Sequence, residues 1–149
     1  MTESEARSRF AAGRVARLAT AGADGRPHLV PVVFAVSGDL VYTVVDAKPK
    51  RTTSLRRLAN VRENPAVALL VDHYDDSDWG ALWWVRADGR GRVLDPAGEI
   101  SSGSGDDRAV EAAEARRAIE LLHHRYPQQE AAGAVLAVDV EHWRGWSAR

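Results

Sequence analysis

Residues 15–45 contain three short segments rich in β-branched residues, separated by two brief turn sequences. The segments run from Val15 to Ala21, from His28 to Val36 and from Leu40 to Val45. Between them, Gly22 to Gly25 and Ser37 to Asp39 supply residue types that tight turns prefer. Strands that follow one another through such short connections pair antiparallel. The first third of the chain therefore predicts an antiparallel β-meander.

Pro31 restricts the position of the second strand in this meander. It lies inside the strand and has no N–H group to donate to a β-ladder. We therefore expect this strand at an edge of the sheet, or bulged at Pro31. Either arrangement leaves backbone groups open to a ligand.

The rest of the chain alternates between helical and strand patterns. Apolar spacing predicts three helices, at Thr2–Ala12, around Leu55–Ala59 and at Ala109–Tyr126, and three further strands, at Ala66–Val71, Leu82–Leu94 and Val135–Val140. Asp95 to Asp107, which is rich in Gly and Ser, reads as a linker. The predicted fold is mainly β (α+β), a small six-stranded antiparallel barrel with flanking helices.

Length and composition limit the class of protein. The 149 residues suit a single domain spanning residues 1–149. The 20 basic and 21 acidic residues nearly cancel, which argues against a nucleic-acid-binding module. The chain has no cysteine, so disulfides, thiolate metal sites and Cys nucleophiles are excluded. No apolar run approaches a membrane span and the first residues are acidic, so we expect no membrane partner and a cytoplasmic location.

A cationic segment precedes the central helix. Lys48, Lys50 and Arg51 stand before or within its first turn, where the helix dipole disfavours cations. A bound phosphate would offset that cost, because free N–H groups and the hydroxyls of Thr52 and Thr53 would converge on it with the cations. The alternative is a solvated basic loop in which the two Thr residues merely cap the helix.

Five tryptophans form the second signal, three of them near the fifth predicted strand (Trp79, Trp83 and Trp84) and two near the end of the chain (Trp143 and Trp146). Neighbouring side chains in a strand point to opposite faces, so at most one of Trp83 and Trp84 fills the barrel interior. The other needs a dimer partner or a flat aromatic cofactor as cover. Packing without any ligand explains any single Trp equally well.

Other polar clusters carry little chemistry. The acidic stretch from Asp72 to Asp78 lacks the Gly and Glu of a calcium loop, and His123 and His124 are adjacent rather than four apart, so we predict no metal site. Hydrolase and nucleotide-binding glycine motifs are missing as well. Catalytic residues stay unassigned.

A set of short motifs in fixed order makes the sequence recognisable. Val15–Thr20, Asp24–His28, Pro31–Phe34, Tyr42–Thr43, Lys50–Leu55 and Asn64–Pro65 resemble the pyridoxamine 5′-phosphate oxidase-like (PPOX class) FMN-binding split β-barrel family. Asp72–Tyr74, Trp79, Leu82–Arg86 and Trp143–Trp146 are similar to its branch of probable coenzyme F420-dependent enzymes. The resemblance covers nearly the whole chain and implies a split barrel.

The resemblance also implies a homodimer whose two cofactor sites are built by both chains. By position, Lys50 and Arg51 match the basic pair that holds the cofactor phosphate, and Thr52 opens the helix beneath it. The strand along the tricyclic ring corresponds to Val32, Val33 and Phe34, the following aromatic–Thr pair to Tyr42 and Thr43, and the aromatic from the partner subunit to Trp79. Residues that would bind pyridoxal phosphate have no counterparts, so vitamin B6 chemistry is not predicted.

The function implied is an F420-dependent oxidoreductase that transfers hydride to a small organic substrate, with an FMN-dependent enzyme or flavin reductase as the alternative. In such enzymes the cofactor ring carries the hydride. The protein binds the cofactor and the substrate, orients them and excludes water. Coenzyme F420 adds an acidic oligoglutamate tail, which Arg56, Arg57 and Arg62 could bind. The alternative is that these three arginines are ordinary solvated helix residues. Two other hypotheses remain: a non-catalytic module that binds a flavin or haem-like ligand, and a structural dimer.

Overall fold

The computed structural model describes residues 1–45, 52–98, 103–130 and 133–149, with only the backbone at 52–55. Within these ranges the elements follow the order α1 (Glu3–Ala12), β1 (Ala16–Ala21), β2 (Pro27–Val32), β3 (Ala35–Ser37), β4 (Leu40–Val44), α2 (Thr52–Glu63), β5 (Ala66–His73), the short 3₁₀ helix η1 (Trp79–Ala81), β6 (Trp83–Leu94), α3 (Gly105–Arg125) and β7 (Val135–Ser147).

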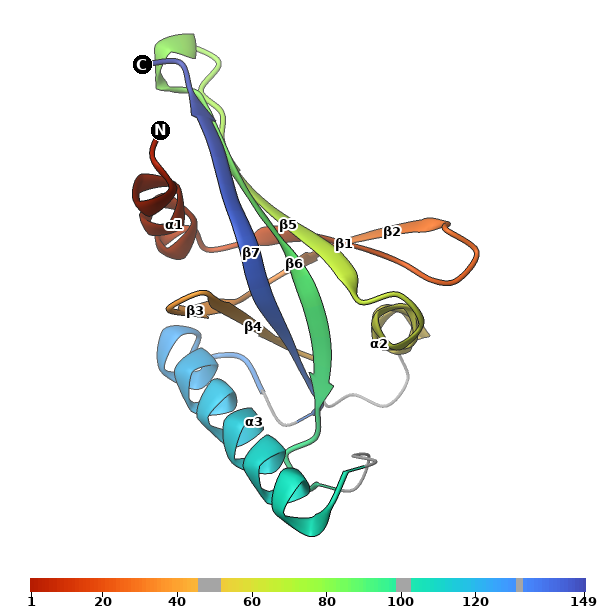
Figure 1. The fold of residues 1–149 in the computed structure, drawn as a ribbon. Helices are drawn as coiled ribbons and strands as arrows, with labels where there is room; N and C mark the ends of the chain where they lie inside the picture. The colour runs from red at the N-terminus through yellow and green to blue at the C-terminus, as the bar shows by residue number, and fades with distance from the viewer. Residues whose placement is uncertain (46–51, 99–102, 131–132) are drawn as a thin grey trace.

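The strands form one antiparallel sheet in the order β2-β1-β5-β6-β7-β4-β3. Its two edge strands, β2 and β3, are consecutive in the chain and joined only by Val33 and Phe34. The sheet must therefore curl until its edges approach each other, which gives the split barrel (Figure 1). The predicted fold class is confirmed.

The predicted strand count was too low by one. The segment from His28 to Val36 was expected as one strand, but β2 ends at Val32 and β3 begins at Ala35. A local β-pattern cannot show that the first part pairs with β1 and the last part with β4. The position of Pro31 was predicted correctly, because β2 is an edge strand whose described partner is β1 alone.

The barrel interior is filled from the inner face of the sheet and from α1. Phe10 lies at the centre, with ring centroids 4.9 Å from Phe34 and 5.3 Å from Trp143. Helix α1 is fixed at its start by a capping box, in which Thr2 and Glu5 each bind the other's backbone N–H. Its inward-facing residues, Ala6 and Phe10, are fully buried.

Helix α3 covers the outer face of β3, β4 and the adjoining ends of β6 and β7 (Figure 1). The second core cluster lies beneath it and includes Tyr42, Val44, Leu94 and Leu122. The helix begins at Gly105, where the Ser104 hydroxyl accepts a hydrogen bond from the Asp107 backbone N–H. The predicted linker thus extends too far, because a cap and a helical turn replace its last residues.

Strands β6 and β7 are the longest of the described strands and pair with each other along their length (Figure 1). The register shifts at Asp88 and Gly89, where any Cβ on Gly89 would collide with the Asp139 carbonyl oxygen. The last strand was predicted as Val135–Val140 but continues to Ser147, so Trp143 and Trp146 lie in the second half of β7. None of the helices in the described ranges is both long and apolar enough to cross a membrane.

Candidate functional site

The uncovered outer face of β1, β5 and β6 carries a groove of about 580 Å³. It is lined by Arg17, Ala19, Leu29, Ala68, Leu69, Leu70, Asp72, His73, Tyr74, Leu82, Trp83, Trp84, Arg86 and Trp146. We call it the outer groove. Leu29 is 67% exposed and Trp146 47%, so large apolar side chains here meet solvent in the single chain. An apolar hollow of this size is typical of a ligand pocket or a protein interface.

The charged groups around the outer groove are paired within the chain. Arg17 lies 3.5 Å from Asp72, and Arg86 binds both carboxylate oxygens of Asp88 at 2.8 and 3.0 Å. The Arg86 guanidinium also lies 5.9 Å from the ring of Trp84. Since burial of an unpaired charge is costly, this pairing suits a face that another apolar surface covers.

The two adjacent tryptophans separate as the strand pattern predicted. Trp83 packs against the inner core and stacks on His73 with centroids 6.2 Å apart, while the Arg9 guanidinium lies 5.5 Å from its ring. Trp84 lies on the opposite side of β6, and both indoles contribute to the lining of the outer groove. Trp83 therefore packs against the barrel core and also reaches the groove, whereas Trp84 lies on the groove side alone.

The predicted ring-binding residues lie at the passage from β2 to β3. Val32 and Phe34 are buried, and the ring of Phe34 has no exposed surface and packs against Phe10. Val33 is partly exposed. Of the three, Val33 is thus the side chain that can meet a ligand, whereas the other two hold the backbone in place.

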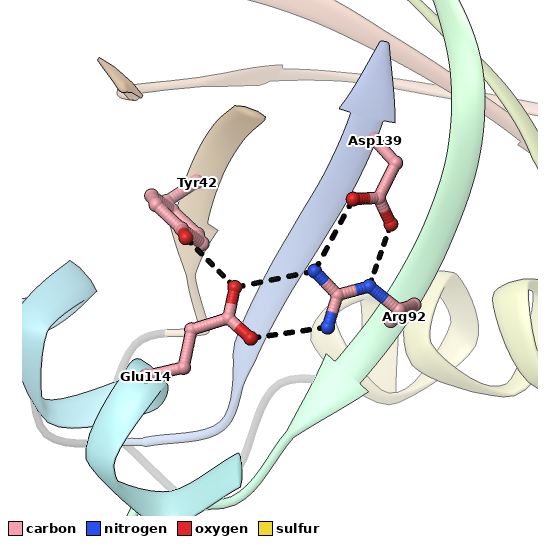
Figure 2. A network of polar contacts seen from close by, with 4 residues as sticks. All are labelled: Tyr42, Arg92, Glu114 and Asp139. Atoms are coloured by element: carbon pink, nitrogen blue, oxygen red, sulfur yellow. Dashed lines mark hydrogen bonds and ion pairs between the residues drawn. The ribbon is translucent and has the colours of Figure 1, made fainter. Parts of the chain in front are cut away.

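The side chains of Tyr42 and Thr43 lie on opposite faces of the sheet, because consecutive side chains of β4 alternate. Both are buried, Thr43 on the barrel side with Val41 and Tyr42 beneath α3. The Tyr42 hydroxyl donates to Oε2 of Glu114 at 2.7 Å (Figure 2). Burial, together with this carboxylate, raises the pKa of Tyr42 to about 12, so the hydroxyl stays protonated as a donor.

Glu114 belongs to a larger ionic network under α3 (Figure 2). Arg92 of β6 donates to both Glu114 oxygens at 3.1 and 3.2 Å and to Asp139 of β7 at 2.6 and 3.4 Å. Burial raises the pKa of Glu114, but the hydrogen bonds from Arg92 and Tyr42 outweigh it and hold that pKa below its usual value. The hydrogen bond to Glu114 is the main cause that raises the pKa of Arg92. The network anchors α3.

The predicted phosphate anchor falls largely outside the described part of the chain. Lys50 and Arg51 lie outside the described residues, as does the side chain of Thr52. The backbone of Thr52 begins α2, as the sequence predicted. The anchor therefore stays a prediction.

Trp79 lies far from α2 within one chain. It sits in η1, before the first residue of β6, and is 67% exposed. Helix α2 packs beside the far part of β6, where Val61 contacts Gly91. The eight residue-to-residue steps from Trp83 to Gly91 span roughly 26 Å of extended strand. Within one chain, η1 with Trp79 therefore lies well apart from α2 (Figure 1).

Polar clusters outside the groove have local roles. Asp75 accepts hydrogen bonds from the backbone and hydroxyl of Ser77, which lower the pKa of Asp75 and close a turn in the acidic loop. Within the described ranges no three His, Asp or Glu side chains are arranged to hold a metal ion.

Sequence reasoning missed several groove residues, notably Leu29, Leu70 and Arg86. Their signal was the alternation of side chains in β2, β5 and β6, which shows that each strand has two faces but not which face the helices leave uncovered. It also missed Tyr126, whose hydroxyl lies 3.0 Å from the Phe34 carbonyl oxygen. A single Tyr after a helix gives no local hint of such a contact.

Comparison with known proteins places this fold in a family. The family model described as pyridoxamine 5′-phosphate oxidase matches residues 2–147. The search of curated proteins found no match.

Three solved structures illustrate the likeness of the fold. A conserved hypothetical protein from Mycobacterium tuberculosis is 20% identical, with 100% of this chain and 86% of that chain covered and a TM-score of 0.71. A FAD-binding protein from Mesorhizobium loti is 21% identical over 97% and 94% of the chains, with a TM-score of 0.65. A FAD-binding protein from Mycobacterium smegmatis is 18% identical over 98% and 94%, with a TM-score of 0.61. The family match spans nearly every residue, and the chain therefore belongs to the pyridoxamine 5′-phosphate oxidase family.

Proposed function

We propose that the protein is a flavin-type oxidoreductase that works as a homodimer, with coenzyme F420 as its cofactor and a small organic molecule as its substrate. The family match supports an oxidoreductase of this type, and two proteins of similar fold are described as FAD-binding. The bound ring would supply the hydride chemistry, so the protein needs no catalytic motif of its own.

The outer groove is the observation that carries the proposal. The groove has an apolar lining, and its charged side chains are paired within the chain. Such a surface is better suited to contact with a second copy of the chain than to contact with solvent. An obligate interface of about 2,000 Å² or more would cover it. Dimerisation would also bring Trp79 of the partner subunit to the α2 end of the first chain. A single chain keeps these two features apart.

The residues present fit a flat ring with an anionic arm. Val33 offers a partly exposed apolar contact on an edge of the barrel, and Arg56 and Arg62 are exposed on α2. Lys50, Arg51 and the start of α2 at Thr52 would hold the phosphate. Val32, Phe34, Tyr42 and Thr43 would support the site through the backbone they fix. Exposed cations on α2 favour coenzyme F420 with its acidic tail.

FMN is the second candidate cofactor. The family description and the FAD-binding neighbours favour a flavin as such. Titration with FMN and with coenzyme F420, followed by absorbance and by light scattering, tests both candidates and the dimer. Binding of either FMN or coenzyme F420 by a dimer with a micromolar or lower dissociation constant supports the proposal. The one that binds more tightly is then assigned as the cofactor. A monomer that binds neither would overturn it.

A further inference from the structure

Among the described residues, the short passage between β2 and β3 has no ladder partner on either side. Pairing ends with Val32 opposite Ala16 and resumes with Ala35 opposite Tyr42. Phe34, in the gap, has no exposed surface, so water cannot reach its backbone groups. Buried backbone N–H and C=O groups need partners within the protein.

Tyr126, the residue after α3, supplies these partners. Its hydroxyl oxygen lies 3.0 Å from the Phe34 carbonyl oxygen, 3.0 Å from the Arg14 carbonyl oxygen and 3.5 Å from the Phe34 nitrogen. A hydroxyl has one hydrogen to donate and can accept as well, so it donates to one carbonyl at a time and accepts from the Phe34 N–H. One side-chain atom thus ties the passage to the loop before β1.

Two arginines complete what we call the α3 clasp, defined as Arg14, Arg125 and Tyr126. Arg14 donates to the Arg125 carbonyl at 3.0 Å, and its guanidinium lies 4.5 Å from the Tyr126 ring. The Arg125 guanidinium lies 5.0 Å from the Phe34 ring and donates to the Gly13 carbonyl. The clasp therefore holds both the main chain and the side chain of Phe34.

We propose that Tyr126 is a positioning residue for the cofactor site, acting through Phe34 to fix the backbone that presents Val33. This inference rests on the proposed function, in which Val32 to Phe34 lie along the ring. The orientation of Val33 follows from the peptide groups on either side of it, and Phe34 has no β-ladder partner in the described part of the chain to set them. The hydroxyl of Tyr126 takes the place of that partner.

The test compares Tyr126→Phe with the unmodified protein by three measurements. These are hydrogen exchange at the Val33 and Phe34 amides, the dissociation constants for FMN and coenzyme F420, and the visible absorption spectrum of the bound ring. We expect faster exchange at both amides, a shifted spectrum, and binding weakened up to about tenfold for the cofactor that the protein uses, as loss of one buried hydrogen bond allows.

Arg92→Gln is the matched control, because it loosens α3 at its middle and leaves the clasp in place. It should lower the melting temperature without changing the dissociation constant or the spectrum. Faster exchange in Tyr126→Phe with unchanged affinity and spectrum would overturn the inference and leave Tyr126 a structural brace. If the unmodified protein binds neither cofactor, the proposed function fails and the inference falls with it, whatever the exchange shows.

Discussion

Tyr42 and Glu114 share a hydrogen bond of 2.7 Å that joins the outer face of β4 to the middle of α3. The family resemblance assigns Tyr42 to the cofactor, but in the structure its hydroxyl binds Glu114 and stabilises the fold. Thr43, its neighbour, is buried on the other face of the strand.

Tyr42→Phe should therefore destabilise the protein. The lost bond goes to a carboxylate, and such hydrogen bonds contribute about 1.5–3 kcal/mol. We expect a fall of this order in the free energy of unfolding, measured in urea. Tyr74→Phe is the control, since the Tyr74 hydroxyl bonds to Asp76 at 2.9 Å on the exposed surface and should contribute little. Equal stability of both variants would contradict the buried role of Tyr42.

Glu114 should make stability depend on pH on the acid side. Its pKa is lowered in the folded protein from the ordinary value of 4.5, so its contribution is fully present above pH 4.5 and is lost as pH falls through the folded pKa. Glu114→Gln should flatten this part of the profile of unfolding free energy against pH. Arg92→Gln should remove the same part, because the guanidinium helps to lower that pKa. An unchanged profile in both variants would contradict the network.

Leu29→Asp tests the outer groove as an interface between copies. Leu29 is 67% exposed in the single chain, so the substitution costs a monomer little, but it buries a charge in a dimer. We expect light scattering to show a monomer. Val110→Asp is the matched control, since Val110 is 68% exposed on α3, away from the groove, and should leave the dimer intact.

Mixing two variants that each bind the cofactor weakly tests whether each site is shared between two chains. Arg51→Ala should weaken cofactor binding by about 10- to 150-fold through loss of a charge-assisted hydrogen bond, and Trp79→Ala should weaken it through lost ring contact. If Trp79 serves the site of the partner subunit, a mixed dimer regains one intact site. Titration of the unfolded and co-refolded mixture should then recover tight binding. No recovery would place both residues in one chain's own site.

The arginines of α2 discriminate between the two cofactors. Arg56 and Arg62 are exposed, whereas burial lowers the pKa of Arg57 and its replacement would disturb the fold. The double variant Arg56→Gln and Arg62→Gln should lose affinity for coenzyme F420 at low salt and keep its affinity for FMN. High salt should abolish the difference, because screening removes exposed ion pairs. Equal losses for both cofactors would assign these residues to the solvated surface.

The sequence by itself determined the local elements of this protein. The capping box at Thr2 and Glu5, the inward-facing residues of α1, the restriction of Pro31 to an edge or a bulge, and the divergence of Trp83 and Trp84 all follow from rules that act within a few residues. The family motifs added the split barrel, which short-range periodicity indicates only as an antiparallel barrel.

Only the tertiary structure decided which faces meet. The split of the second strand at Val33 and Phe34 arises because the sheet closes on itself, a constraint that involves β1 and β4 together. The pairing of Tyr42 with Glu114 and of Tyr126 with Phe34 depends on where α3 docks. Such contacts join residues about 70 to 90 positions apart. Their geometry is set by the closed sheet and the packed helix, and no local pattern encodes it.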